Sequence, residues 1–277
     1  MKIAVQLPLL PGDTPRDKAK WARDHGVEGI ELNVWGKGLA GIRREAEEIG
    51  GAVPISSVCA NTDPEGHNSF DFLDPDLAKR RASIDGSKAI LAFCAEVGAV
   101  GQVVPPIFGP PKVPDLSPFM TPLQVEDQLM LAACREIGPY AAERGVVFML
   151  EPLNRYEQHY LRRQVDALRI IQEAEVPGIG LLSDTFHMHI EETDMPRALR
   201  EAGDRITEVH LADNTRLEPG TGDIDFVAIF RALLDVGFTG YMAYECGLSG
   251  ETPAEKATSL ARSLDFVRKC IADARRQ

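Results

Sequence analysis

A set of side chains that could bind a metal ion is spread across the second half of the chain: Glu151, Asp184, His210 and Glu245. Each ends a short apolar run that is typical of a β-strand, and successive members are 33, 26 and 35 residues apart. Carboxylate oxygens and an imidazole nitrogen are ligands of divalent cations such as Mn²⁺ and Mg²⁺, with Co²⁺ or Zn²⁺ as alternatives. The set therefore predicts a site for one divalent metal ion.

The spacing of these residues indicates which elements must position them. Each gap has the length of one strand followed by one helix, and a parallel barrel collects the ends of its strands around a single rim, where its site lies. Side chains alternate between the two faces of a strand, so Glu151 shares its face with Met149 and His210 shares its face with Glu208. These faces are mostly apolar below their last residue, as expected for strands that fill a barrel.

Strand-like and helix-like segments alternate along almost the whole chain, which predicts a parallel sheet. The expected strands are 2–7, 28–33, 54–59, 100–104, 146–151, 179–184, 206–210 and 241–245. The expected helices are 14–25, 37–50, 74–97, 122–144, 161–175, 193–203, 223–237 and 252–274. Such an α/β pattern predicts a (β/α)₈ TIM barrel, a fold that forms one domain of ~250 residues. We therefore expect residues 1–277 to form a single domain.

Composition limits the classes of protein to which the chain can belong. The formal net charge is −12 and the isoelectric point is near 5.0, which disfavours binding to nucleic acid or to an anionic membrane surface. The sequence has no apolar run of the ~18 residues that suggest a membrane-spanning helix. The five cysteines form no CxxC pair, and the chain starts without a signal-peptide pattern. We expect reduced thiols and a cytoplasmic location.

Further polar residues gather in three segments around the candidate ligands. The segments are EPLNRYEQHY at 151–160, SDTFHMHIEE at 183–192 and VHLADNTRLEPGTGDIDF at 209–226. The GTGD turn in the third segment lacks the GxGxxG and Walker spacings, so it predicts a tight turn rather than a phosphate-binding loop.

A proline-rich segment, 105–122, connects the fourth expected strand to its helix. In a barrel this segment leaves from the rim that holds the site, and a loop of such length is usually functional or mobile. Two interpretations stay open. The segment is either a lid or wall of the site, or a rigid surface excursion without a role in the chemistry.

These motifs resemble the xylose-isomerase-like TIM-barrel superfamily of sugar isomerases and epimerases, and among its members the D-tagatose, D-psicose and L-ribulose 3-epimerases. The family's Glu-x-x-Asn-Arg-[Phe/Tyr]-Glu run matches 151–157, and its Asp-Thr-Phe-His-Met-x-Ile-Glu-Glu run matches 184–192. Its His followed six residues later by Arg matches His210 and Arg216, and the Glu of its last strand matches Glu245. The first half of the chain fits only in its alternation of strands and helices.

The resemblance implies a role for each matched residue. One divalent ion, usually Mn²⁺, would be bound by Glu151, Asp184, His210 and Glu245. The O1–O3 end of a sugar substrate would be held by Glu157, His187 and Arg216. Two of the metal ligands, Glu151 and Glu245, would also be the catalytic acid and base. The resemblance further suggests a homodimer or homotetramer that assembles through the outer helices.

The implied reaction is C3 epimerisation of a ketose through a metal-stabilised enediolate. A proton beside a ketone is weakly acidic, so a Lewis acid must stabilise the enediolate, while two carboxylates on opposite faces act as base and acid. An enzyme of the hydroxypyruvate isomerase or inosose dehydratase type, on the same site, is the alternative. An endonuclease-IV-like DNA repair enzyme is disfavoured by the six histidines and the charge of −12, and a non-catalytic barrel is disfavoured by the intact ligand set.

The chain departs from the family pattern at several positions. An aromatic residue is usual after the first strand, where this chain has Gln6 and Leu7, and Glu245 is followed by Cys and Gly rather than by Pro and Phe. Glu208 stands where the family often has a second His. We expect Glu208 either to point inward and orient His210 or to be turned outward by a bulge. These departures affect the choice of sugar more than the metal, so the sugar and its phosphorylation stay open.

Overall fold

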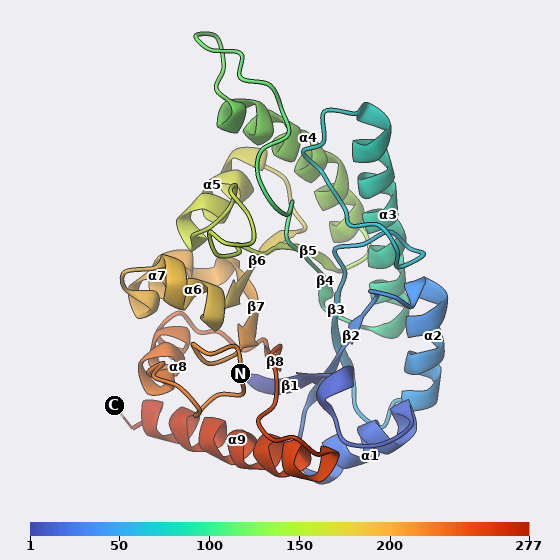
Figure 1. The fold of residues 1–277 in the computed structure, drawn as a ribbon, viewed down its shortest axis with the longest axis vertical. Coiled ribbons are helices and arrows are strands. Elements are labelled where there is room, and N and C mark those ends of the chain that lie inside the picture. The colour runs from blue at the N-terminus through green and yellow to red at the C-terminus, as the bar shows by residue number, and fades with distance from the viewer. Residues whose placement is uncertain (277) are drawn as a thin grey trace.

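The computed structural model describes residues 1–276, which fold into a closed parallel β-barrel surrounded by helices (Figure 1). The strands are β1 (Lys2–Gln6), β2 (Gly29–Asn33), β3 (Ile55–Cys59), β4 (Gly101–Val104), β5 (Val147–Leu150), β6 (Ile179–Asp184), β7 (Ile206–Leu211) and β8 (Tyr241–Tyr244). They follow one another around the barrel in sequence order, and β8 pairs with β1 to close it. The predicted (β/α)₈ barrel is confirmed.

The helices pack on the outside of the barrel. They are α1 (Pro15–Asp24), α2 (Gly38–Ile49), α3 (Leu77–Val97), α4 (Pro122–Ala142), α5 (Gln164–Ala174), α6 (Thr185–Glu191), α7 (Met195–Ala202), α8 (Phe226–Asp235) and α9 (Pro253–Ala274). Helices α1, α4 and α9 each begin with a threonine cap followed by a proline, which supplies an acceptor for the first backbone N–H groups and a preset φ. Among residues 1–276, the helices are too short or too polar to span a bilayer.

Apolar side chains from four neighbouring strands fill the inside of the barrel. They are Cys59, Val103, Met149 and Leu182. Because side chains alternate along a strand, the inward position of Met149 places Glu151 on the same inner side, and Leu182 does the same for Asp184. The side chains of Glu151 and Asp184 therefore point into the barrel at its rim, as the sequence predicted.

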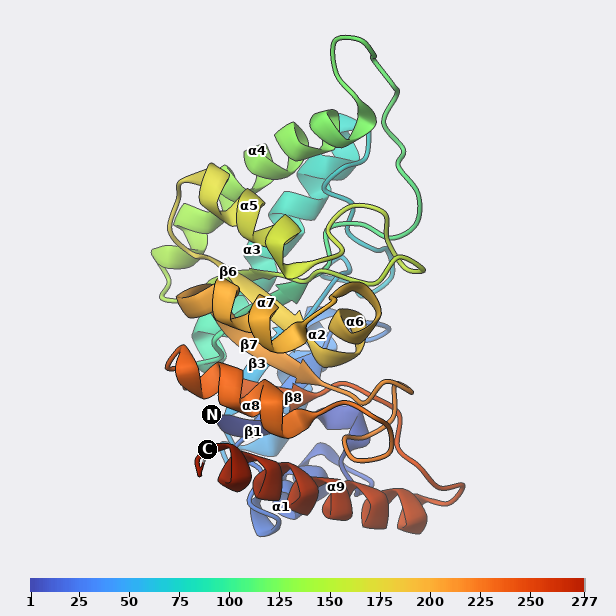
Figure 2. The same cartoon turned by 90° about the vertical axis from the view of Figure 1, so that its left-hand side faces the viewer.

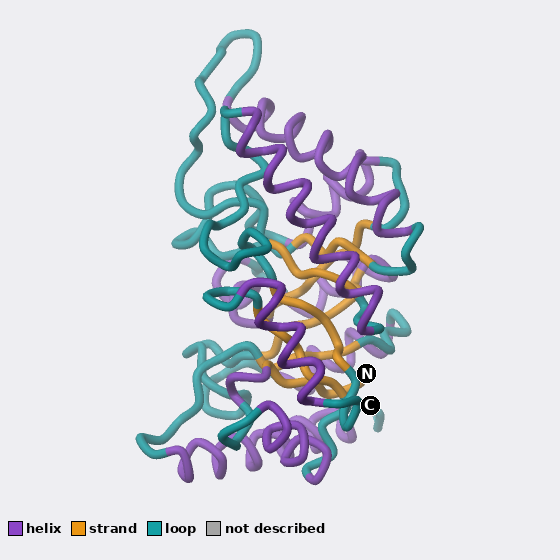
Figure 3. The backbone as a smooth tube through the Cα atoms, turned by 90° about the vertical axis from the view of Figure 1, so that its right-hand side faces the viewer, coloured by secondary structure: helices purple, strands orange, loops and turns teal. Residues whose placement is uncertain are grey.

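The two ends of the barrel differ in the segments that they carry. Figure 2 shows the long loops on one side of the barrel. The first strand begins on the other side, where α9 also ends (Figure 2). Figure 3, seen from the opposite direction, shows the strands enclosed by helices. All strands are parallel, so their C-terminal ends open toward the same loop-rich rim.

Some boundaries differ from the predicted ones. Helix α6, over Thr185–Glu191, was not predicted; it begins where β6 ends because Asp184 Oδ1 accepts hydrogen bonds from the backbone N of Phe186 (2.7 Å) and of His187 (3.2 Å). A helix of seven residues has too few turns to show a periodic pattern. The helix expected from residue 74 instead starts at Leu77, with Asp76 as its cap.

Candidate metal centre

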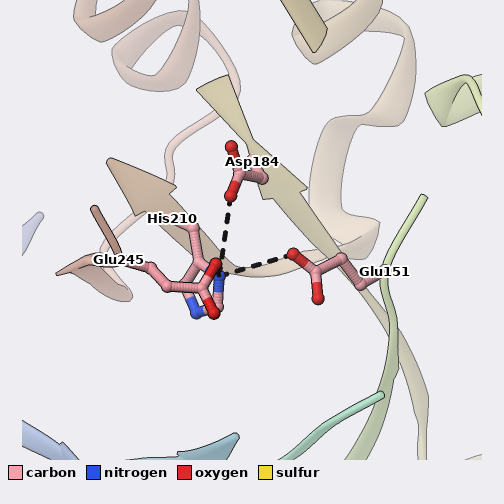
Figure 4. A group of neighbouring side chains, drawn as sticks. All are labelled: Glu151, Asp184, His210 and Glu245. Atoms are coloured by element: carbon pink, nitrogen blue, oxygen red, sulfur yellow. Dashed lines mark ion pairs between the residues drawn. The ribbon is translucent and has the colours of Figure 1, made fainter. Parts of the chain in front are cut away.

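The structure brings the four predicted metal ligands together. They lie at the ends of β5, β6, β7 and β8, and one ligand atom of each lies within 4.8 Å of the others. His210 is central: its Nδ1 is 3.1 Å from Glu245 Oε2 and 3.5 Å from Glu151 Oε1. The same nitrogen is 3.9 Å from Asp184 Oδ2. Figure 4 shows Glu151 and Glu245 reaching His210 from opposite sides.

Unpaired atoms in this group are suited to binding a cation. Glu151 Oε1 and His210 Nδ1 are buried and have no hydrogen-bond partner among residues 1–276. An unpaired buried polar atom costs about 1–3 kcal/mol, and both of these atoms point into the same group of carboxylates. A divalent cation would pair with both, because carboxylate oxygens and imidazole nitrogens are its usual ligands. The donor set therefore fits a divalent metal ion.

The second ring nitrogen of His210 is held by Glu31, a residue of β2 that the sequence analysis did not single out. His210 Nε2 donates to Glu31 Oε2 at 3.1 Å, and both side chains are fully buried. Burial lowers the pKa of His210, but the negative charges of Glu31 and Glu245 outweigh burial and raise this pKa well above its ordinary value. A carboxylate in this position fixes the ring so that Nδ1 faces the other ligands. The sequence signal that could have identified Glu31 is a glutamate in the middle of a mostly apolar strand.

A buried network connects Glu31 to the rest of the centre. Gln6 Nε2 donates to Glu31 Oε1 at 2.8 Å and to Glu245 Oε1 at 3.2 Å. Ser57 Oγ lies 2.8 Å from both Glu31 Oε2 and Glu208 Oε1. These contacts hold side chains from β1, β2 and β3 against the ligands from β7 and β8.

Glu208 points into the barrel and is not turned outward by a bulge. It is 1% exposed, although the pairing of β6 with β7 shifts register next to it. Glu208 Oε1 accepts a hydrogen bond from Ser57. The residue beside His210 is Glu31, although that place was expected for Glu208. Burial and then the charge of Glu31 raise the pKa of Glu208 well above its ordinary value. Glu208 therefore supports the network under the site rather than the imidazole itself.

Arg216 lies against two of the ligand carboxylates. Its Nη1 donates to Asp184 Oδ2 at 2.6 Å, and its Nη2 donates to Glu245 Oε2. Its guanidinium also lies 4.9 Å from the centre of the Phe186 ring. The backbone of Arg216 has φ of 59°, a left-handed conformation that costs a residue other than glycine about 1–3 kcal/mol. Strain of this kind is typical of functional sites.

His187 and Glu157 lie at the same rim and are connected by Asn154. His187 Nδ1 accepts hydrogen bonds from the backbone N (3.2 Å) and from Nδ2 (2.8 Å) of Asn154. The ring proton is therefore on Nε2, which lies 4.0 Å from Asp184 Oδ2. Asn154 Nδ2 also donates to Glu157 Oε1 at 2.8 Å. Of the residues expected to bind substrate, Arg216 and His187 thus lie next to ligand carboxylates, and Glu157 lies next to His187.

The two glutamates expected to act as acid and base have different surroundings. Burial raises the pKa of Glu151 above its ordinary value, although the interaction with His210 opposes the change. Burial also raises the pKa of Glu245, but the positive charges of His210 and Arg216 outweigh burial and lower this pKa below its ordinary value. Environments that separate the pKa values of two carboxyl groups are typical of acid–base pairs.

The proline-rich segment 105–122 has two parts with different surroundings. Near its start, Gly109 N donates to Glu157 O at 2.8 Å, and Gly109 O accepts from His159 Nδ1 at 2.7 Å. Its tip, where Leu116 pairs with Met120, projects past the start of α4 and away from the barrel (Figures 1 and 2). The base of the segment therefore contacts the loop that carries Glu157 and His159, while the tip is a surface projection.

The fold and the position of the ligand group agree with the family to which the sequence can be assigned. Residues 19–270 match the family described as Xylose isomerase-like TIM barrel. This match covers most of the chain, so the protein belongs to the xylose isomerase-like TIM-barrel family. The resemblance that the motifs indicated is confirmed.

Several relatives with assigned activities are sugar epimerases, enzymes of the isomerase class. The chain is 32% identical over 274 residues to the 3-dehydro-D-guloside 4-epimerase of Escherichia coli (strain K12), which covers 98% of this chain and 100% of that enzyme. The crystal structure of an apo 3-keto-D-glucoside 4-epimerase from E. coli matches with a TM-score of 0.82 and 30% identity, over 98% of this chain and 100% of that chain. The D-psicose 3-epimerase of Enterocloster bolteae is 40% identical over 111 residues, 40% of this chain and 37% of that enzyme.

Proposed function

We propose that this protein is a divalent-metal-dependent sugar epimerase that inverts a hydroxyl-bearing carbon beside a ketone. The reaction removes a proton from that carbon, passes through an enediolate, and returns a proton to the opposite face. The observation that carries this proposal is the approach of Glu151 and Glu245 to His210 from opposite sides (Figure 4). The first candidate reaction is C3 epimerisation of a ketose.

Glu151 and Glu245 are the proposed acid–base pair. They extend from the ends of β5 and β8, on opposite sides of His210. A planar enediolate between them would present one face to each carboxyl group, so one group removes the proton and the other returns it. The configuration of the substrate decides which of the two acts first.

A metal ion and three further side chains would bind and orient the sugar. Glu151, Asp184, His210 and Glu245 would hold one ion, for which we propose Mn²⁺ because carboxylates dominate the set. When bound, the ion supplies a Lewis acid that stabilises negative charge on the sugar oxygens. His187 Nε2 and the Arg216 guanidinium would donate hydrogen bonds to the same oxygens, and Glu157 would accept one from a hydroxyl.

A second candidate reaction is C4 epimerisation of a 3-keto-glycoside. It is favoured by the similarity along the full length to the 3-dehydro-D-guloside 4-epimerase, whereas the D-psicose 3-epimerase is similar over 111 residues. Both reactions invert a carbon beside a ketone, so the same acid–base pair would serve either. They differ in the part of the substrate that lies beyond the reacting atoms.

Exchange of hydrogen with solvent distinguishes these reactions. The Mn²⁺-loaded protein would be incubated in D₂O with a panel of free ketoses and with methyl 3-keto-glycosides. Deuterium at C3 of an inverted ketose supports the first candidate, and deuterium at C4 of an inverted keto-glycoside supports the second. Deuterium at C1 or C2 of an aldose–ketose pair would indicate an isomerase, and loss of water a dehydratase.

A double variant controls for the proposed roles. Glu151→Gln combined with Glu245→Gln keeps the size of both side chains but removes both bases. Incorporation that persists in this variant contradicts the acid–base assignment, and absence of incorporation with every sugar contradicts the proposed function.

We also propose a cytoplasmic homodimer or homotetramer. The cysteines of the described residues are unpaired, as expected in a reducing compartment. Light scattering after size-exclusion chromatography would measure the mass of the assembly.

A further inference from the structure

A second recess lies on the same rim as the ligand group, on the side of β2, β3 and β4. It has a volume of about 570 Å³ and is bounded by the loops after these three strands and by the start of α3. Trp35, His67, Phe70, Ala82 and Lys112 contribute to its lining. None of the residues assigned to metal or substrate above belongs to this lining.

The loops that form this cavity leave from strands that touch the ligand group. Glu31 of β2 contacts His210, and the thiol of Cys59, at the end of β3, lies 3.7 Å from Glu245 Oε1. Trp35 is two residues beyond the end of β2, which is roughly 7 Å along an extended chain. A substrate larger than one sugar ring could therefore contact both the ligand group and the cavity.

Trp35 offers the cavity an aromatic face on a fixed backbone. The residue is 54% exposed, and its backbone N donates to Asn33 Oδ1 at 2.8 Å. The next residue, Gly36, donates to Gly66 O at 2.9 Å, which ties the loop after β2 to the loop after β3. Within residues 1–276, no hydrogen bond involves the indole N–H or the ring of His67. An aromatic ring with a free N–H can pack on the C–H face of a sugar and bind a hydroxyl.

The charges around the cavity favour an uncharged ligand. Lys112 pairs with Asp71, and Lys79 pairs with Asp74 at 3.3 Å. The remaining carboxylate, Asp63, accepts hydrogen bonds from backbone N–H groups of its own loop. Both lysines of the lining are thus already neutralised, and one carboxylate is in excess. A phosphate or a carboxylate would find no unpaired cation in this lining, whereas a neutral sugar would find hydrogen-bonding groups.

We propose that this cavity is a subsite for an uncharged sugar ring that is joined by a glycosidic bond to the reacting keto-sugar. The proposal selects the second candidate reaction, so that the substrate class is a keto-glycoside rather than a free ketose, with the ketone-bearing ring at the ligand group and the second ring against Trp35. The placement of the first ring rests on the proposed function. The affinity of the cavity for the second ring can be measured without any reaction.

Two variants change the cavity in opposite ways. Trp35→Ala removes the aromatic face, and Ala82→Phe fills the space from an exposed position on α3. The matched control is Phe119→Ala, which removes an aromatic side chain that is 89% exposed at the tip of segment 105–122. The probes are a disaccharide with a C3 ketone on its non-reducing ring and the methyl glycoside of that keto-sugar. Calorimetry gives Kd for each probe, and exchange in D₂O gives KM.

We expect the wild-type protein to bind the keto-disaccharide more tightly than the methyl keto-glycoside by about tenfold, the size of effect expected for burying one aromatic face. Trp35→Ala and Ala82→Phe should remove this preference, and Phe119→Ala should retain it. A wild-type protein without the preference, variants that keep it, or a loss caused by Phe119→Ala would each overturn the subsite.

The two proposals fail in different ways. If calorimetry shows the Trp35-dependent preference but no probe exchanges hydrogen, the subsite stands and the epimerase activity is wrong. If free ketoses exchange hydrogen and no variant changes the relative affinities, the activity stands and the subsite is wrong.

Discussion

Glu31 holds the imidazole that faces the ligand carboxylates, so we expect it to control metal affinity. Its Oε2 accepts the hydrogen bond of His210 Nε2 at 3.1 Å. Glu31→Gln replaces the charged acceptor by a neutral amide, which holds the ring of His210 more weakly. Loss of such a partner typically weakens metal binding about 10–100-fold. Calorimetric titration of the metal-free protein with Mn²⁺ would measure the change in Kd.

Glu208→Gln is the matched control for this prediction. Glu208 is as deeply buried as Glu31, but its hydrogen bond goes to Ser57. We expect the Kd for Mn²⁺ to stay close to the wild-type value. Equal losses in the two variants would mean that any change in the buried network disturbs the site, and that orientation of His210 is not the cause.

The sequence predicted the candidate metal ligands that the structure brings together, but not the residues that contact them from other strands. Asp184 and His210 are polar residues at the ends of apolar strands, a pattern that is visible within a single segment. Glu31, Gln6 and Ser57 act through contacts with side chains of other strands, and His210 is 179 residues from Glu31. Such contacts depend on how the strands align around the barrel, which no local pattern specifies.

His159 connects three separate segments through both nitrogens of its ring. Its Nε2 lies 2.8 and 2.9 Å from the two oxygens of Glu126, in α4, and its Nδ1 lies 2.7 Å from Gly109 O. Both nitrogens can donate only when the imidazole is charged. Burial lowers the pKa of His159, but hydrogen bonds to Glu126 and Gly109, together with the charges of Glu126 and Asp71, outweigh burial and raise this pKa above 6.5.

The sign of this pKa change predicts a pH-dependent stability. A pKa that is higher in the folded state makes protonation favour folding, so the contribution is fully present below about pH 6.5 and is lost as pH rises through the folded-state pKa. We expect His159→Gln to lower Tm most at about pH 6 and progressively less toward about pH 9. Thermal unfolding of both proteins across this range measures the difference. A constant difference at every pH would contradict the role of protonation.

The contact between β4 and β5 has no space for a side chain at Gly101. An added Cβ would lie 1.9 Å from Val147 O, and Gly101 is paired with Val147 in the sheet. Gly101→Ala must therefore displace a strand, and we expect it to destabilise the protein by at least about 1–3 kcal/mol, the range for overpacking. Gly237→Ala is the comparison, because Gly237 has open space but φ of +71°. This variant should cost roughly 1–2 kcal/mol.

Urea unfolding would give the free energy of unfolding for both glycine variants. The prediction is that Gly101→Ala loses more stability than Gly237→Ala. The opposite order would mean that β4 can move away from β5 more easily than its pairing suggests.

The alternation of segments predicted the barrel well because each strand and helix repeats the same pattern. The exception was α6, which depends on a cap from Asp184 rather than on a periodic apolar face. The shape of segment 105–122 was also open, since its base is held by contacts with Glu157 and His159. Those contacts come from a loop more than 40 residues later in the chain.

A metal bound at the strand ends should stabilise the barrel as a unit. The proposed ligands come from β5, β6, β7 and β8, so an ion would join the last four strands. A ligand that binds only the folded state at 100 times its Kd adds about 2.7 kcal/mol to the free energy of unfolding. At about 2–4 °C per kcal/mol for a chain of this size, Mn²⁺ should raise Tm by about 5–10 °C.

Two substitutions at the rim separate metal binding from general effects on the loops. Glu151→Gln removes a proposed ligand, so the rise in Tm with Mn²⁺ should disappear. Glu157→Gln changes a neighbouring carboxylate whose side chain is 43% exposed and which lies outside the ligand group, so its rise should match that of the wild type. An unchanged rise in Tm with Glu151→Gln would contradict the assignment of Glu151 as a ligand of the stabilising ion.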